Sequence, residues 1–382
     1  MRAANRGDLL LIAGLVAGAW MLAPRPGAAA AAAAPEKLPA WLHEMTLDGF
    51  FEASYSYNFN RPASATNQFR VFDFDDNSFK VDEFELVAQR AVAKARDAGF
   101  RVDLTLGSSV PRITASTGLF RDASGTAGDL DVHQAFASYI APWGSGLRVD
   151  AGKFITSHGY EVIDGYDGWN DNSTRSLLFG YAIPFTHVGV RGAYTISPRV
   201  AGTLMVVNGW DVARDNNRAK SVGAQLALTP SAALSVVVSG MVGPERAGND
   251  RNSRSLLDLV VIFKPRDRLT LGANADWGFE NGPVGPGLGG GWSGIAGYAR
   301  IAVTSTFAFS LRGESFDDRD GARTGVVQTI GELTATPELR LTPHFLVRGD
   351  VRVDRSDQSV FEKPGGFVKT QPTVMIEVIH AF

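Results

Sequence analysis

Four acidic residues lie close together in a stretch that also holds three aromatic residues and three glycines: Glu161, Asp164, Asp167 and Asp171. The stretch is too long and too often broken by glycine to be a simple turn, and long irregular segments are commonly functional. Carboxylates there could line the narrowest part of a water-filled passage and select solutes by charge. The alternative is an ordinary surface loop, or one that contacts another subunit.

The other candidate residues are polar side chains at alternate positions of apolar stretches: Arg101, Asp103, Arg191, Asn274, Asp276, Arg312, Glu314, Arg348, Asp350, Arg352 and Asp354. A charge that faces lipid costs about 2–4 kcal/mol at the bilayer midplane. If the apolar faces meet lipid, these side chains must therefore face an enclosed lumen. Arginines opposite carboxylates would create a transverse field that screens solutes; the simpler interpretation is that they only solvate a polar interior.

Other kinds of chemistry find little support. The absence of cysteine excludes thiolate catalysis and thiolate metal sites, and a net charge of −3 gives no basic surface for nucleic acid. The stretch 285–290 matches G-x-G-x-x-G but lies between predicted strands, where no dinucleotide would bind. The six histidines form no ligand pair on one strand face. We therefore predict no catalytic residue, no cofactor and no metal. Asp73, Asp75, Asp76 and Asn77 could gather a calcium ion, but their spacing lacks the glycine and the terminal glutamate of an EF-hand loop. We therefore favour the interpretation that they are solvated acidic residues of a loop.

Residues 1–34 are predicted to be a signal peptide. Arg2 and Arg6 precede an apolar run, Leu9–Ala23, which Pro24 ends. The run is shorter than the roughly 20 apolar residues that a membrane helix needs. Residues 35–45 are then a short periplasmic segment, and residues 46–382 form the remaining domain. Since no other stretch could cross a membrane as a helix, membrane residence would require a β-barrel.

The mature sequence alternates with a period of two. In residues 100–106 the apolar positions are every second residue, and residues 268–280 repeat the pattern. Such alternation indicates strands with one apolar and one polar face. The windows 81–92, 131–140, 147–157 and 254–263 show mixed faces.

Strand length and loop asymmetry favour a membrane barrel. Several runs reach the roughly 9–11 residues that a tilted strand needs to cross a bilayer. Short turns alternate with long polar loops, as in outer-membrane barrels. The long loops cover about 60–79, 108–129, 158–184, 210–219, 244–253, 281–292, 318–325 and 356–368. We predict an all-β fold, a transmembrane antiparallel up-and-down β-barrel of about 16 strands with short periplasmic turns and long extracellular loops, wide enough for an aqueous channel.

The chain ends on an alternating strand that closes with an aromatic residue. Val374, Ile376, Val378 and Phe382 fall on one face. A terminal Phe382 in this position resembles the assembly signal of bacterial outer-membrane proteins.

Three segments resemble one family: residues 47–53, residues 152–161 and residues 183–191. They are similar to the OmpL-like β-barrel porins of Gram-negative bacteria, and the similarity runs from about residue 46 to the end. The resemblance implies an outer-membrane location and passive transport of small hydrophilic solutes. It implies no substrate, because it carries no selectivity motif.

The expected function is that of a porin, a non-enzymatic diffusion channel narrowed by the acidic third loop. Expected partners are outer-membrane lipid and lipopolysaccharide, the barrel-assembly machinery and small hydrophilic solutes, with no nucleic acid; a homotrimer follows by analogy only. The alternatives are an adhesive or structural barrel that binds through its loops, and an outer-membrane hydrolase. The short segment 35–45 cannot form the plug of an energised transporter.

Overall fold

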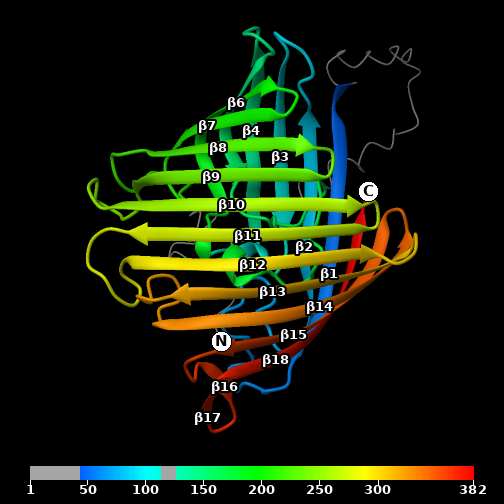
Figure 1. Cartoon of the computed structure of the whole chain (residues 1–382), viewed down its shortest axis with the longest axis vertical. Helices are drawn as coiled ribbons and strands as arrows, with labels where there is room; N and C mark the ends of the chain where they lie inside the picture. Colours follow the sequence, from blue (N-terminus) through cyan, green and yellow to red (C-terminus); the bar gives the residue numbers. More distant parts are fainter. Residues whose placement is uncertain (1–43, 113–125) are drawn as a thin grey trace, which may run out of the picture. The chain divides into compact units, whose positions relative to one another are not determined.

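The computed structural model describes residues 44–112 and 126–382, so the predicted signal peptide and most of the segment 35–45 lie outside the described residues. Within the described ranges, sixteen strands form one closed antiparallel barrel (Figure 1), as predicted. The strands are β1(Thr46–Asn58), β2(Ser78–Arg90), β3(Ala98–Leu106), β4(Leu130–Ala141), β5(Leu147–Ile155), β6(Thr186–Ser197), β7(Val200–Val207), β8(Ser221–Ser231), β9(Leu234–Pro244), β10(Ser253–Arg266), β11(Leu269–Glu280), β12(Gly290–Ala302), β13(Phe307–Asp318), β14(Gln328–Thr342), β15(Phe345–Ser356) and β18(Thr370–Ala381). None of the described helices is long and apolar enough to span a membrane.

The barrel closes where its first and last strands meet. β1 pairs with β18, with Phe50 opposite Ala381 and Asn58 opposite Thr373. Each remaining strand pairs with its neighbours in sequence, except that β15 pairs with β18. Closure satisfies the backbone hydrogen bonds of every strand and leaves no free edge, which is the condition for residence in lipid.

Short and long connections alternate along the barrel. β6–β7, β8–β9, β10–β11 and β14–β15 join through tight turns, whereas the other ends carry the long loops. We call three of these loops L1 (59–77), L3 (156–185) and L4 (208–220). The last long loop contains a small hairpin of β16(Phe361–Lys363) and β17(Gly366–Val368). The predicted loop asymmetry is thus confirmed.

Side chains alternate between the two faces of the wall. On β13, Leu311 is 41% exposed on the outer face, whereas the neighbouring Arg312 is fully buried on the inner face. The same contrast separates Val351 and Arg352 on β15. The apolar side chains therefore form the surface that lipid would contact, and the charged ones point inward.

Two β-bulges that lie away from the tight turns interrupt this alternation. A register shift between β1 and β2 leaves Asp82 without an opposite residue, and both Asp82 and Glu83 are buried. A second register shift, between β3 and β4, leaves His133 without an opposite residue, and both His133 and Gln134 are buried. A bulge adds one residue and redirects side chains. Each bulge therefore turns two consecutive polar side chains inward.

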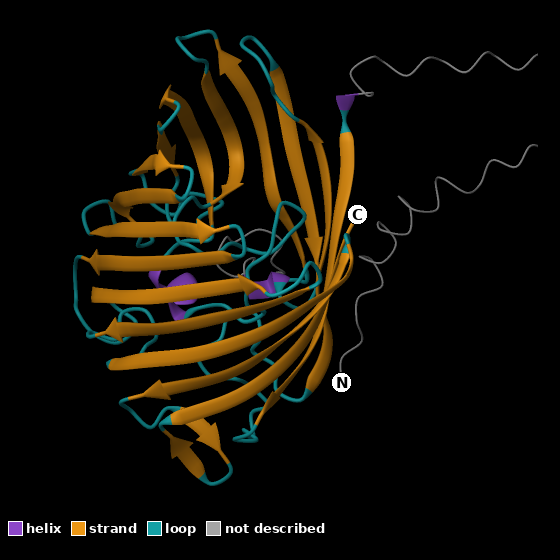
Figure 2. Cartoon of the chain, turned by 45° about the vertical axis from the view of Figure 1, so that its right-hand side comes forward, coloured by secondary structure: helices purple, strands orange, loops and turns teal. Residues whose placement is uncertain are grey.

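An apolar cluster fills part of the interior, which the alternation did not predict. It combines residues of L3, including the π-helical turn Leu178–Ala182, with inward residues of the wall such as Trp292 and Phe316. Residues of L1, including Phe72, pack against it. Figure 2 shows loop segments and short helices inside the ring of strands. The interior is therefore partly a packed core, because L3 carries apolar side chains that need apolar partners.

The C-terminal aromatic ring covers a glycine. The backbone amides of Gly49 and Phe382 bond to each other's carbonyls at 2.8 and 2.9 Å. The Phe382 ring lies over Gly49, and a Cβ on that glycine would come within 2.3 Å of it. The ring thus closes the barrel seam on a position that only glycine fits.

Substituting Gly49 with valine should displace the Phe382 ring and weaken the seam. Overpacking of this kind costs about 1–3 kcal/mol. We expect a lower apparent melting temperature and a smaller fraction of folded barrel after refolding, measured by circular dichroism and gel mobility. Gly297, where a Cβ meets nothing within 4 Å, provides the matched control. Equal losses in Gly49→Val and Gly297→Val would contradict the role of the ring.

Candidate functional site

Loop L3 folds into the barrel and is attached to the wall by ion pairs. The Glu161 carboxylate accepts a hydrogen bond from the Arg312 guanidinium at 2.7 Å, and Arg312 also donates to Glu332 at 2.7 Å. The side chains of all three residues are almost completely buried. A buried ion pair holds its partners in place because breaking it leaves an uncompensated charge.

Asp164 forms a second attachment point. Its carboxylate accepts hydrogen bonds from Arg348 at 2.9 Å and from the Asn170 backbone amide at 2.8 Å, and Arg175 lies 2.8 Å away. Arg348 in turn pairs with Glu377 of β18. The arginines of the wall therefore neutralise both Asp164 and Glu161.

Hydrogen bonds from L3 to carboxylates of the wall, together with one aromatic contact, complete the attachment. Thr174 donates its amide and hydroxyl to Asp350, at 2.7 and 2.8 Å, and the amide of Leu177 donates to Glu314 at 2.5 Å. The Tyr160 ring stacks on Tyr298 with ring centres 4.0 Å apart. L3 is thus fixed along the inner faces of β12 to β15.

The other two acidic residues of L3 remain partly exposed. The side chain of Asp167 is 56% exposed and forms an ion pair with Arg101 of β3. The side chain of Asp171 is 30% exposed, 3.3 Å from Arg300. Burial raises the pKa of Asp171 above its ordinary value, and the Arg300 guanidinium opposes that shift.

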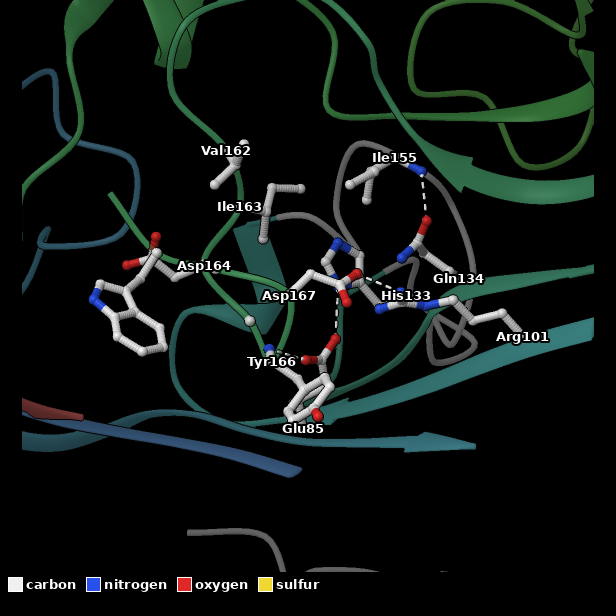
Figure 3. Close-up of a pocket in the computed structure, with 13 residues that line it drawn as sticks. Glu85, Arg101, His133, Gln134, Ile155, Val162, Ile163, Asp164, Tyr166 and Asp167 are labelled. Carbon is white, nitrogen blue, oxygen red and sulfur yellow. Dashed lines mark hydrogen bonds and ion pairs between the residues drawn. The ribbon is translucent and has the colours of Figure 1, made fainter. Parts of the chain in front are cut away.

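A cavity of about 180 Å³ lies between L3 and the wall formed by β2 to β4 (Figure 3). We call it the constriction cavity. Its L3 side is residues 162–169, and its wall side is Glu85, Arg101, His133 and Gln134. Figure 3 shows the Arg101 guanidinium reaching the Asp167 carboxylate, with which it forms an ion pair at the border of this cavity. Charged and apolar side chains of L3 and of the opposite wall thus meet around this small space.

A second cavity, of about 350 Å³, is lined by four arginines: Arg90, Arg101, Arg148 and Arg191. We call it the arginine cavity. It shares Arg101, Gln134, Ile155 and Asp167 with the constriction cavity, so the two are contiguous.

Two of the carboxylates that pair with these arginines, Asp150 and Asp103, are buried, whereas Asp167 and Glu44, the partners of Arg101 and Arg90, are exposed. Asp150 bonds to both Arg148 and Arg191 at 2.9 Å, yet its side chain is only 4% exposed, against 45% for Arg148. The partner of Arg101 on the wall, Asp103, is fully buried. The charged described residues that line the arginine cavity are four arginines and one carboxylate, Asp167, so positive side chains predominate there.

The predicted residues thus fall into two groups. Arg101, Asp103 and Arg191 lie in or beside the arginine cavity, whereas Arg312, Glu314, Arg348, Asp350 and Arg352 lie beneath L3 and contact it. Arg90 and Arg148 are not among the predicted residues. Arg148 shares a strand face with Asp150, whereas Arg90, at the end of β2, is in register with the apolar Leu86 and Ala88, so the alternation does not mark Arg90 as inward. The assignment of four acidic residues of L3 to a constriction stays a prediction.

One group of described residues could hold a metal ion: Glu83, Glu85 and His133, whose ligand atoms all lie within 4.8 Å of one another. The acidic residues of L1 are engaged otherwise. Asp73 pairs with Arg70, and Asp76 accepts a hydrogen bond from the Asn58 amide at 2.6 Å.

The family sequence model described as "Putative beta-barrel porin-2, OmpL-like" matches residues 44–382. The chain belongs to this family. The match covers the entire barrel and confirms the resemblance seen in the sequence. No protein of the curated collection matches the sequence.

Solved structures of porins share the fold of this family member. An anion-selective porin from Comamonas acidovorans superimposes with a TM-score of 0.59 at 12% identity, over 88% of this chain and 99% of that one. OprB of Pseudomonas putida superimposes with a TM-score of 0.59 at 11% identity, over 90% of this chain and 95% of that one. The trimer form of OmpT, an outer-membrane protein of Vibrio cholerae, gives 0.56 at 11% identity, over 88% and 99%. At such identities the likeness establishes an outer-membrane porin fold and not a solute.

Proposed function

We propose that this porin-family barrel is a water-filled channel for passive diffusion of small hydrophilic solutes and ions across the outer membrane. One observation carries the proposal: L3 is attached to β12–β15 and leaves two contiguous cavities, each lined in part by charged side chains, against the opposite wall. A loop held to one side narrows a barrel without filling it. Such a channel needs neither a catalytic residue nor a cofactor.

The narrowest part of the proposed path lies beside Asp167, which contacts the wall of β2 to β4 at Arg101. Of the four acidic residues of L3, Asp167 and Asp171 are accessible to a solute, and Glu161 and Asp164 hold the loop in place. Arg101 pairs with Asp167 where the constriction cavity and the arginine cavity adjoin. Positive charge on one side and negative charge on the other create a transverse field that acts on passing ions.

Neutralising Asp167 should make the channel less favourable to cations. In bulk water a unit charge about 4 Å from an ion contributes about 1 kcal/mol, so in Asp167→Asn we expect the cation-to-anion permeability ratio to fall several-fold. Reversal potentials in a salt gradient across a planar bilayer measure this ratio, and stable conductance steps without an energy source test the channel itself.

Asp267 is the matched control for this experiment, because it is exposed in the tight turn between β10 and β11. Asp267→Asn should leave the permeability ratio unchanged. An unchanged ratio in Asp167→Asn would remove Asp167 from the path, whereas the lack of any conductance step in the wild type would remove the channel.

Export and assembly complete the proposal. Residues 1–34 have the basic start and apolar run of a signal peptide, and residues 35–45 would lead into the barrel. Phe382 would act as the assembly signal, in support of which its ring closes the seam over Gly49. A homotrimer in lipid and lipopolysaccharide is supported by the trimer form of the Vibrio cholerae protein.

A further inference from the structure

The two β-bulges bring a histidine and a glutamate together on the inner wall. On β2 the bulge turns Glu83 inward one residue early, so that Glu83 and Glu85 share the lumen face. On β4 the other bulge turns His133 inward beside Gln134. β3 lies between these strands, with Thr105 opposite both Glu85 and Asp131. Bulges next to functional sites commonly redirect one side chain.

Four polar atoms of this cluster lack hydrogen-bond partners among the described residues. His133 is 3% exposed, and within residues 44–112 and 126–382 neither of its ring nitrogens has a hydrogen-bond partner. Its Nδ1 lies 3.6 Å from Glu85 Oε1. Oε1 of Glu83 and Oγ1 of Thr105, both on buried residues, also have no hydrogen-bond partner among the described residues. Since a buried polar group without a partner costs about 1–3 kcal/mol, this concentration of such groups indicates a missing ligand.

The geometry points to a binding site for a divalent transition-metal cation, of which Zn²⁺ is the representative, held by Glu83, Glu85 and His133. One imidazole and two carboxylates suit zinc and its neighbours, whereas calcium and magnesium prefer oxygen ligands alone. Tetrahedral zinc requires ligand atoms about 3.3 Å apart. Atoms already within 4.8 Å reach that spacing by small side-chain rotations. A fourth position is left for water or a solute group.

The site adjoins the proposed path. Glu85 and His133 both line the constriction cavity, and Oε2 of Glu85 accepts a hydrogen bond from the Tyr166 amide of L3 at 2.8 Å (Figure 3). A bound dication would offset the negative charge of the two glutamates beside the narrowest part. It would also link L3 to the opposite wall through Glu85. Metal occupancy would therefore lower the preference of the channel for cations.

Binding itself is tested by calorimetry on the detergent-solubilised full barrel after chelator treatment, titrated with Zn²⁺. We expect one ion per chain in the wild type. His133→Ala should weaken binding at least tenfold, since even outer-shell substitutions cost 10–100-fold, and Glu83→Gln should do the same while preserving shape. His344→Ala, in the exposed turn before β15, is the control and should bind normally. Wild-type affinity in both His133→Ala and Glu83→Gln, or no wild-type binding at all, would overturn the site.

The effect on transport is measured separately. Micromolar Zn²⁺ should lower the cation-to-anion permeability ratio of wild-type channels in planar bilayers and leave His133→Ala channels unchanged. Because calorimetry needs no conducting channel, failure of the diffusion function would leave the binding result intact. Binding with an unchanged permeability ratio would overturn only the link to the path.

Discussion

Replacing Arg312 with methionine is expected to release L3 from the barrel wall and to enlarge the channel. Arg312 is fully buried, and its guanidinium bonds to Glu161, to Glu332 and to the carbonyl oxygen of Thr174. Methionine would fill part of the space and satisfy none of these groups. Removing one partner of a buried ion pair costs about 3–5 kcal/mol, since the remaining charge stays buried.

Three measurements should report that release. The single-channel conductance of Arg312→Met should rise, and L3 should become accessible to protease in the folded barrel. The apparent melting temperature should fall. Arg340→Met is the matched control: Arg340 is 45% exposed at its side chain and lies 3.8 Å from Glu338, so its pair is worth less than about 1 kcal/mol.

A double variant separates attachment of the loop from general damage to the wall. Adding Glu161→Gln to Arg312→Met removes the carboxylate left on L3, so the double variant should be more stable than the sum of the two single losses predicts. If Arg312→Met conducts like the wild type and melts at the same temperature, the ion pair does not hold L3.

The fold could be predicted from the sequence because each residue that faces lipid must be apolar, whatever its neighbours are. Leu311 and Arg312 differ in polarity, and this alone assigns them to opposite faces. The windows 81–92 and 131–140 showed mixed faces for a physical reason: the bulges at Asp82 and His133 turn two consecutive residues inward. A strict period of two cannot describe such a strand.

The path of L3 could not be predicted in the same way. It depends on pairs far apart in sequence, such as Glu161 with Arg312 and Asp164 with Arg348. Many arginines alternate along the strands, and nothing local indicates which of them a given carboxylate will meet. The cluster of Glu83, Glu85 and His133 has one local signal, two glutamates spaced by two, but its histidine arrives from another strand through a bulge.

Acidification should weaken the barrel through His158, at the start of L3. Its Nδ1 lies 3.1 Å from the Thr156 hydroxyl, and burial lowers the pKa of His158 to about 3, with the neighbouring His187 acting in the same direction. The unfolded chain binds a proton below about pH 6.5 and the folded chain does not. The free energy of unfolding is therefore unaffected by protonation of His158 above pH 6.5. It falls by about 1.4 kcal/mol per pH unit as the pH drops from 6.5 toward 3.

Between pH 7.5 and 5 the free energy of unfolding of the wild type should thus fall by about 2 kcal/mol more than that of His158→Gln. Urea unfolding midpoints of the barrel in liposomes at each pH measure this difference. Asp211 of L4, whose pKa burial raises to about 6, acts in the opposite sense, because its folded form takes up a proton in this range. That contribution is common to both proteins and cancels in their difference. His344→Gln, in an exposed turn, should keep the wild-type pH dependence. Parallel pH profiles for the wild type and His158→Gln would show that His158 is protonated without opening L3.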